Sequence, residues 1–303
     1  MNSAFAPERN KLPGNPEITK CIKDIEARSL AGGGFADQPE CPLRPDSTAW
    51  AVLALESAGT GTSLVDGGRS ALAAGQFVDG RVHMPDAPEV IWPTPLAILA
   101  WLKDAKYLEA RNRAIDLLLK ISGSHWNKIP GHPSEHDTSL AGWAWAIGTH
   151  SFIEPTVMAI LALEITRHDN HPRFMEGISL IMDRRLSRGG WNYGNTRVYG
   201  SELFPFIDTT GMALTALAGH TSEESVKSSI DYLRAGVENC RTPLSLGWAL
   251  FGLGAWGIFP EESGAWIEQT LTRQEKFGSY GTSLLSILAL AFFSRGDFRK
   301  SFE

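Results

Sequence analysis

Three acidic residues stand at corresponding places of three apolar segments. Asp46 follows Pro45 in Pro-Asp-Ser-Thr-Ala, Glu154 occurs in Ile-Glu-Pro-Thr, and Asp208 occurs in Ile-Asp-Thr-Thr-Gly. A carboxyl group in a water-poor, aromatic pocket has a raised pKa and keeps its proton near neutral pH. The pattern predicts general-acid chemistry, and the alternative is that each acid caps the N-terminus of a helix.

Aromatic residues gather around the same places in the sequence. The negative face of an aromatic ring stabilises a cation by about 0.5–2 kcal/mol per contact, so a wall of such rings suits a carbocation intermediate. An aromatic belt between two layers of helices would have the same spacing. The residues that we expect to bind substrate, besides Asp46 and Glu154, are Trp50, Trp92, Trp143, Trp145, Phe152, Trp191, Tyr193, Phe206 and Trp248.

The elements that must position these residues belong to an internal repeat. Six segments are apolar around most of their circumference, as expected for buried helices. They cover residues 44–59, 91–105, 153–167, 207–220, 241–257 and 280–294. Six charged segments with one apolar stripe alternate with them and predict partly exposed helices. These cover residues 17–30, 63–78, 108–122, 173–187, 222–236 and 262–276.

Six buried helices that alternate with six partly exposed ones predict an all-α, (α/α)6 toroid. An open array of helix pairs would need polar caps at both ends. The last inner segment is as apolar as the others, so it requires cover on all sides, which closure onto the first pair supplies. We expect residues 1–16 to be an N-terminal extension and residues 17–303 to form a single toroid domain.

Three stretches also resemble a known family. The loops at 32–48 and 189–211, with the stretch 142–163, resemble the repeats of squalene cyclases and of prenyltransferase β subunits. In those repeats a Gly-aromatic turn leads into an inner helix that begins with an acidic residue and Ser or Thr. The resemblance is to the terpenoid cyclase and protein prenyltransferase superfamily, and it implies the toroid fold over nearly the whole chain.

The class II terpene cyclase branch implies a role for Asp208. Enzymes of this branch protonate an alkene or epoxide with an Asp at the start of an inner helix, in Asp-x-Asp-Asp-Thr-Ala or Asp-Cys-Thr-Ala. Asp208 matches the catalytic position, whereas Phe206 and Thr209 stand where the longer motif has further acids. The resemblance implies acid-initiated cyclisation of an isoprenoid chain, with Asp208 as proton donor and no cofactor or metal.

Three alternatives remain open. A prenyltransferase β-like subunit would need a zinc site, but Glu238-Asn239-Cys240 only loosely matches the Asp-x-Cys pair and no later His completes it. A non-catalytic module that binds an isoprenoid or a peptide would fit the incomplete acidic motif. A carbohydrate-active enzyme would use two of the acids, since some glycosidases share the double ring.

We expect no functional site in two further polar segments. His132-Pro-Ser-Glu-His136 has the spacing of a helical zinc motif, but its proline predicts a loop, so we expect no metal there. The alternative is a metal site in this loop, formed by His125, His132, Glu135 and His136. The cluster Arg184, Arg185 and Arg188 is expected to be a solvated face, with a diphosphate grip as the alternative.

Composition limits the partners. The net charge of -6 argues against a nucleic-acid partner, which requires a basic surface. Three scattered cysteines and the absence of a signal-peptide-like or membrane-spanning run predict a cytoplasmic protein. We expect a hydrophobic, isoprenoid-like substrate. One toroid supplies only part of a cyclase cavity, so a homodimer, a second subunit or peripheral membrane contact would complete it.

Overall fold

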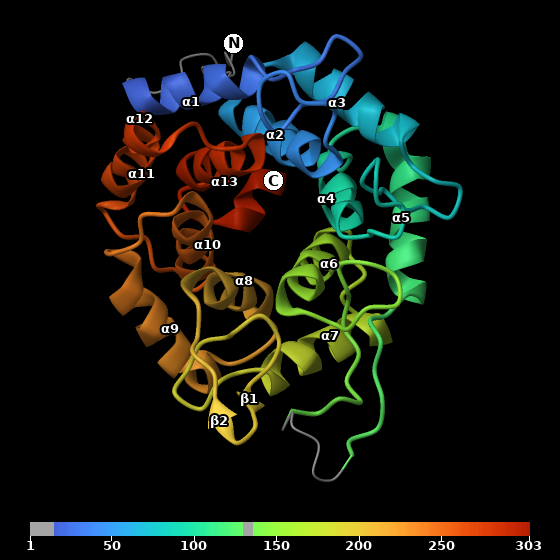
Figure 1. The fold of residues 1–303 in the computed structure, drawn as a ribbon, viewed down its shortest axis with the longest axis vertical. Helices are drawn as coiled ribbons and strands as arrows, with labels where there is room; N and C mark the ends of the chain where they lie inside the picture. Colours follow the sequence, from blue (N-terminus) through green and yellow to red (C-terminus); the bar gives the residue numbers. More distant parts are fainter. Residues whose placement is uncertain (1–14, 130–135) are drawn as a thin grey trace, which may run out of the picture.

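The computed structural model describes residues 15–129 and 136–303. Within these residues, six helices form an inner ring (Figure 1). They are α2 (Pro45–Ala58), α4 (Pro93–Ala100), α6 (Ile153–Ile165), α8 (Ile207–Leu217), α10 (Pro243–Gly254) and α13 (Thr282–Phe293). Each packs on the next, and α13 packs back on α2, so the ring is closed. The predicted (α/α)6 toroid is confirmed.

A second layer of helices surrounds this ring (Figure 1). It consists of α1 (Pro16–Glu26), α3 (Thr62–Ala74), α5 (Leu108–Lys120), α7 (Pro172–Asp183), α9 (Glu223–Val237) and α11 (Ser263–Thr272). Shorter elements are η1 (Ala105–Tyr107), α12 (Gln274–Phe277), η2 (Phe298–Phe302) and the antiparallel pair β1 (Arg197–Val198) and β2 (Ser201–Glu202). Of the predicted N-terminal extension, residues 1–14 lie outside the described residues, and Asn15 caps α1.

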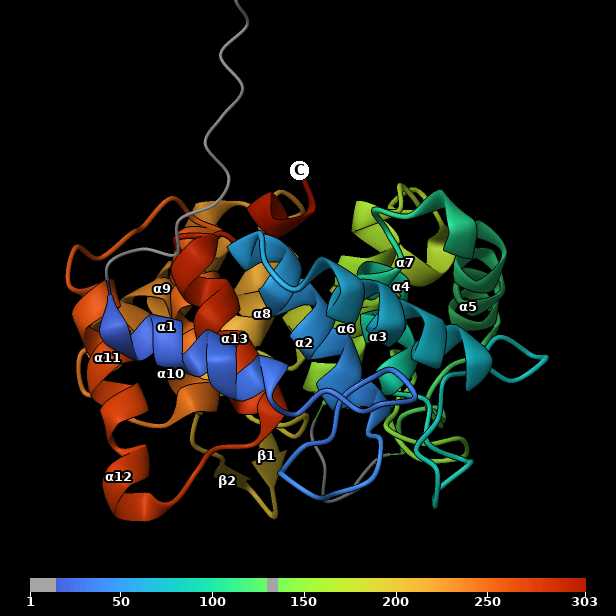
Figure 2. The same ribbon diagram turned by 90° about the horizontal axis from the view of Figure 1, so that it is seen from above.

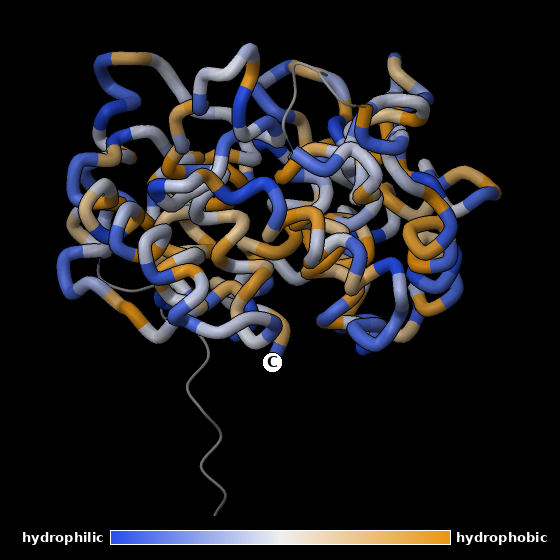
Figure 3. The backbone as a smooth tube through the Cα atoms, turned by 90° about the horizontal axis from the view of Figure 1, so that it is seen from below, coloured by the Kyte–Doolittle hydropathy of each residue, from blue (hydrophilic) through white to orange (hydrophobic). Residues whose placement is uncertain are grey.

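The hydrophobic core lies between the two layers and inside the inner ring. Apolar segments concentrate in the inner helices, and polar segments lie at the periphery (Figure 3). Every residue of α4 is buried, whereas α1 buries only Ile18, Cys21, Ile22 and Ile25. None of the helices in the described ranges has the length and apolar character needed to cross a membrane.

A threonine in the first turns of four of the six inner helices, α2, α4, α6 and α8, explains the repeated sequence pattern. Thr156 Oγ1 in α6 accepts a hydrogen bond from the backbone N–H of Trp143 at 3.0 Å, and so holds the preceding loop against the helix. Gly142 must lack a side chain, because a Cβ there would lie 2.4 Å from Thr156 Oγ1. The same bond joins Thr48 to Phe35, Thr94 to Val82, and Thr210 to Trp191. The Gly-aromatic turn is therefore a docking site for this threonine.

The inner helices do not begin at the acidic residues, as the capping interpretation would require. Arg44, Phe152 and Phe206 are the N-cap residues of α2, α6 and α8, and none makes a side-chain capping hydrogen bond. Each N-cap is extended and belongs to the docked loop, so the acid that follows is the second residue of the helix. Capping by Asp46, Glu154 or Asp208 was therefore wrong. A carboxylate in the first turn is still favoured by the helix dipole.

The two ends of the inner ring differ. At one end, which we call the open face, lie the first turns of α2, α4, α6, α8, α10 and α13 with their preceding loops and the β1–β2 pair. At the other end, the closed face, η2 lies over the centre of the ring (Figures 1 and 2). Phe298 of η2 is buried there against Trp50, Trp248 and Phe251, with ring centroids 5.2–6.4 Å apart.

The seam between the first and last inner helices is held by polar contacts. The Asp37 carbonyl accepts hydrogen bonds from Thr282 N at 2.9 Å and from Arg28 Nη1 at 3.0 Å. Ser47 Oγ lies 2.8 Å from Asp37 Oδ1 and 3.0 Å from Ser283 Oγ. These contacts join the N-terminal loop to α13.

Candidate active site

Two of the three predicted acids form a pair at the open face. Glu154 and Asp208 are each the second residue of their helix, and α6 and α8 are neighbours in the ring. The pKa of Glu154 is raised to about 8, first by burial and then by the negative charge of Asp208. Within the described parts of the chain, neither carboxyl group has an ion-pair or hydrogen-bond partner. At neutral pH Glu154 therefore holds a proton beside a second acid.

The third acid is not part of this pair. Asp46 is only 2% exposed, and its two carboxylate oxygens lie 2.8 and 3.0 Å from Arg44 Nε. The hydrogen bond to Asp46 raises the pKa of Arg44. Asp46 is thus a neutralised carboxylate, although its position in the repeat is the same as that of Glu154 and Asp208.

Asp208 also acts on the thiol that the prenyltransferase alternative would use. The pKa of Cys240 is raised to about 11, first by burial and then by the charge of Asp208. A thiol with a raised pKa stays protonated at neutral pH and is a poor nucleophile. In the described ranges no three His, Cys, Asp or Glu side chains gather as a metal site would require.

Five of the predicted aromatic residues are partly exposed near the open face. Trp92 and Trp145 meet edge to face, with ring centroids 5.5 Å apart. Tyr193 and Phe206 have centroids 5.0 Å apart and are 51% and 39% exposed. Phe152, the N-cap of α6, is partly buried. These residues belong to the loops and first turns that surround Glu154 and Asp208.

The other four aromatic residues are buried. Trp143 and Trp191 lie between the layers, where their Nε1 atoms donate to backbone carbonyls of α5 and α7 at 3.0 and 2.7 Å. Trp50 and Trp248 pack on each other and on Phe298 toward the closed face. None of the four is more than 4% exposed, so their contacts in this structure are packing contacts.

Known proteins are similar to this chain in structure, whereas comparisons of sequence find no match. No family model matches the chain, and no curated protein matches it in sequence. Among solved structures, an Asp-to-Asn variant of the type II terpene cyclase MstE from Scytonema, in complex with its substrate geranylgeranyl dihydroxybenzoate, matches with a TM-score of 0.58 and 12% identity. The match covers 95% of this chain and 99% of that one. The chain has a terpenoid cyclase-like fold.

Other enzymes share this terpenoid cyclase-like ring. An α-1,6-mannanase from Salegentibacter sp. HEL1_6 matches with a TM-score of 0.60 and 12% identity, over 92% of this chain and 99% of that one. An inactive variant of that mannanase, with two Asp-to-Asn substitutions, has been solved with α-1,6-mannotriose. A protein from Actinoplanes matches with a TM-score of 0.56 and 14% identity, over 87% and 82% of the two chains. At these identities the likeness establishes the fold.

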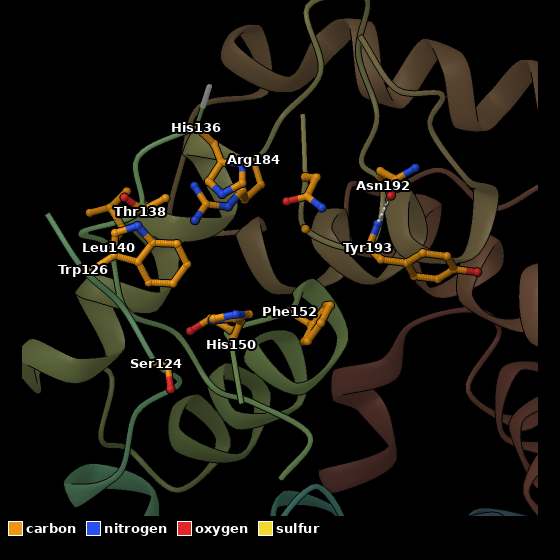
Figure 4. Close-up of a pocket in the computed structure, with 13 residues that line it drawn as sticks. Ser124, Trp126, His136, Thr138, Leu140, His150, Phe152, Arg184, Asn192 and Tyr193 are labelled. Carbon is orange, nitrogen blue, oxygen red and sulfur yellow. Dashed lines mark hydrogen bonds between the residues drawn. The ribbon is translucent and has the colours of Figure 1, made fainter. Parts of the chain in front are cut away.

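The terpenoid cyclase-like ring also has a cavity that the sequence patterns did not predict. It lies beside the start of α6, has a volume of about 510 Å³, and is formed by the loops that precede α6 and α8. Its walls include Trp126, Thr138, His150, Phe152 and Arg184 (Figure 4). The residues come from loops of irregular sequence, so no periodic signal could have assembled them.

The structure places the two polar segments as follows. His132 and Glu135 lie outside the described residues, while His136 lines the cavity. Arg184 was expected on a solvated face, and this was wrong, because it is 5% exposed and also lines the cavity. Its guanidinium nitrogens donate to the Asp137 carbonyl and to Asp183. Arg188 is exposed, as expected.

Proposed function

We propose that this chain is a class II terpene cyclase-like enzyme, in which the Glu154–Asp208 pair supplies the proton that starts cyclisation of an isoprenoid chain. The observation that carries the proposal is that Glu154 and Asp208 start two neighbouring inner helices without a hydrogen-bond or ion-pair partner among the described residues, where burial raises the pKa of Glu154 to about 8. An acid with this pKa is largely protonated at neutral pH and lies in the range favoured for general-acid catalysis. The proposal keeps Asp208 in the site but assigns the proton to Glu154, because burial, and after it the charge of Asp208, raises the pKa of Glu154.

The reaction is an isomerisation. Glu154 transfers its proton to a terminal double bond of the substrate, whose electron pair forms the new C–H bond and leaves a carbocation on the adjacent carbon. Internal double bonds attack this cation in turn and close the rings. The final cation loses a proton either to the Glu154 carboxylate, which restores the acid directly, or to water, after which solvent reprotonates Glu154. The exposed ring faces among Trp92, Trp145, Tyr193 and Phe206 would stabilise the cations.

Glycoside hydrolysis is a second candidate, favoured by a specific observation. A pair of carboxyl groups is the machinery of most glycosidases, one of them protonated and the other ionised. Glu154 would protonate the glycosidic oxygen, and Asp208 would act as base or nucleophile. The α-1,6-mannanase with the same fold supports this candidate.

The cyclase candidate requires a cover over the open face, because its carbocations must be protected from water. Tyr199 and Phe204, in and beside the β1–β2 pair, are 84% and 82% exposed. We include in the proposal that a second copy, another subunit or a membrane surface covers these residues. Sedimentation of the protein with and without lipid vesicles distinguishes the three.

The test compares wild type with three variants of the repeated acid position. Each is incubated with farnesyl, geranylgeranyl and squalene-type substrates and, separately, with α-1,6-mannan oligosaccharides. Glu154→Gln should lower turnover by about 100-fold or more, since an amide has no acidic proton. Asp208→Asn should lower it less, and Asp46→Asn, whose carboxylate is paired with Arg44, should leave it unchanged.

Which substrate turns over decides between the two candidates. Cyclised hydrocarbon or alcohol products identify the cyclase, and newly formed reducing ends identify the glycosidase. Equal turnover by wild type and Glu154→Gln would remove the acid role. A wild type that converts none of these substrates but binds an isoprenoid would instead indicate the binding module.

A further inference from the structure

The cavity beside α6 has a set of lining residues that the proposed reaction does not use. Phe152, the extended N-cap of α6, contributes to its wall, whereas Glu154 and Asp208 are not among the described residues that line it. The Tyr193 ring, which packs on Phe206, points away from Trp126 and His150 (Figure 4). The cavity therefore adjoins the carboxyl pair but is lined by other residues.

The charges of the cavity exclude an anionic ligand. Arg184 is the cation in its wall, and it is 5% exposed and already paired with Asp183. Both of its terminal nitrogens also donate to the Asp137 carbonyl, at 3.1 Å. A buried cation whose charge and donors are satisfied has little left to offer a phosphate or carboxylate.

The polar groups of the cavity equally exclude a purely apolar ligand. Thr138 is 6% exposed, and its buried hydroxyl has no hydrogen-bond partner within the described residues. A buried unsatisfied hydroxyl costs free energy, which a ligand hydroxyl would recover. His150 and Asn195 also line the cavity, and in the described ranges their side-chain polar atoms make no hydrogen bond. These groups are neutral or weakly basic donors and acceptors.

Flat apolar surfaces complete the wall. Trp126 meets His150 with ring centroids 5.0 Å apart, and both lie on one side of the cavity with Phe152, opposite Arg184 (Figure 4). A ligand that suits these walls is neutral, carries many hydroxyl groups, and has flat patches of C–H bonds that pack on aromatic rings. A volume of about 510 Å³ is within the usual range for small-molecule sites.

We propose that this cavity is a saccharide-binding site, in which Trp126 packs against the C–H face of a sugar ring and Thr138, His150 and Asn195 bond its hydroxyl groups. The proposal goes beyond acid-initiated cyclisation and does not require it. In a cyclase the site would hold a glycosyl group or an oligosaccharide regulator. In a glycosidase it would hold sugar units away from the carboxyl pair.

The experiment titrates the whole protein with α-1,6-mannotriose, maltotriose and cellotriose, followed by tryptophan fluorescence and calorimetry. At least one trisaccharide should bind with a Kd below about 10 mM. Trp126→Ala should weaken it by at least about 10-fold and Asn195→Ala by about 3- to 10-fold, as expected for one lost platform and one lost hydrogen bond. Glu154→Gln should bind as wild type, which separates this site from the proposed catalytic pair.

Two substitutions of Thr138 separate binding from folding. Thr138→Val keeps the shape but loses the hydroxyl, and should weaken binding by about 3- to 10-fold. Thr138→Ser keeps the hydroxyl and should restore binding. Absence of binding by all three trisaccharides, unchanged binding by Trp126→Ala, or displacement of a bound trisaccharide by geraniol with tighter geraniol binding to Thr138→Val would overturn the proposal.

Discussion

The two ends of helix α6 carry two glutamates in opposite electrostatic states. Glu154, at the open face, has no cationic partner among the described residues, and burial and Asp208 raise its pKa to about 8. Glu164, at the closed face, is also buried, which raises its pKa. The contact with His220 Nε2 at 3.3 Å, together with the hydrogen bonds and the charge of Arg299, outweighs this, so the pKa of Glu164 is lowered overall.

Within helix α6, Glu164 makes contacts that stabilise the fold, and Glu154 is the residue that we propose to be reactive. At the closed face Arg299 lies 2.7 and 3.0 Å from the Glu164 oxygens and donates to the carbonyls of Thr215 and Ala218, so it joins α6 to α8. At the open face the two acids of the same helices are left with no such partner. The fold thus neutralises the glutamate at the closed face and leaves the one at the open face without a cationic partner among the described residues.

The largest expected effect is on the closed face. Phe298→Ala should lower the free energy of unfolding by about 3–5 kcal/mol, because it removes a fully buried ring packed on Trp50, Trp248 and Phe251. Urea denaturation measures the change. Phe302→Ala, in the same element but partly exposed, is the control and should cost clearly less. Equal costs would mean that the closed face is not stabilised by the aromatic cluster.

Removing the cation from the closed face should be next in size. Arg299→Met should destabilise the protein by about 2–4 kcal/mol, because it leaves the Glu164 carboxylate buried without its main partner. Adding Glu164→Gln to this variant should recover part of the loss, and the double-mutant cycle measures the coupling. Additive losses would show that the pair contributes little.

The two glutamates should affect the pH dependence of stability with opposite sign. The raised pKa of Glu154 means that its protonated form fits the folded state, so its contribution is complete below about pH 4.5 and is lost as pH rises toward 8. Glu154→Gln should therefore flatten the fall in stability over this window, by roughly 1–3 kcal/mol. The lowered pKa of Glu164 means that its contribution is present above pH 4.5 and is lost in acid.

Thermal melts of wild type, Glu154→Gln and Glu164→Gln from pH 3 to pH 9 test both signs. Glu154→Gln should differ from wild type in slope between pH 4.5 and about pH 8, and Glu164→Gln below pH 4.5. The comparison between the ends of α6 fails if both variants alter the slope in the same pH range.

The smallest effect should come from Asp208. Asp208→Asn removes the charge that raises the pKa of Glu154, while burial remains the larger cause. The alkaline limb of the activity profile should move to lower pH by less than about one pH unit. Asp46→Asn should leave the limb in place. A limb unmoved in Asp208→Asn would show that the two acids are not coupled.

The ring was predictable because it is repeated, whereas the closed face was not. Apolar and amphipathic segments alternate with a regular period, and consecutive inner helices must be neighbours in a closed ring. Glu154 and Asp208 occupy the same place in consecutive repeats, so their proximity is contained in the repeat, although the protonation of Glu154 depends on burial. Phe298 and Arg299 lie outside every repeat, and no periodic pattern marks them.

The threonine contact of the inner helices was misjudged for a physical reason. The sequence pairs an acid with a following Ser or Thr, and both residue types are good helix caps. In the structure Thr156 and Thr210 bind the preceding loops, and the N-cap residues are therefore Phe152 and Phe206. A side chain that bonds the backbone of a distant loop leaves no local signal that distinguishes it from a cap.

The seam has a consequence for synthesis on the ribosome. Ser47 and Ser283, which meet across it, are 236 residues apart, and α2 packs on both α4 and α13. Until α13 has left the exit tunnel, the nascent chain is an incomplete arc whose first inner helix has an apolar flank uncovered. Such a flank is prone to aggregation during the many seconds of translation. The first inner helix is therefore the part of the growing polypeptide that waits longest for its last neighbour in the ring.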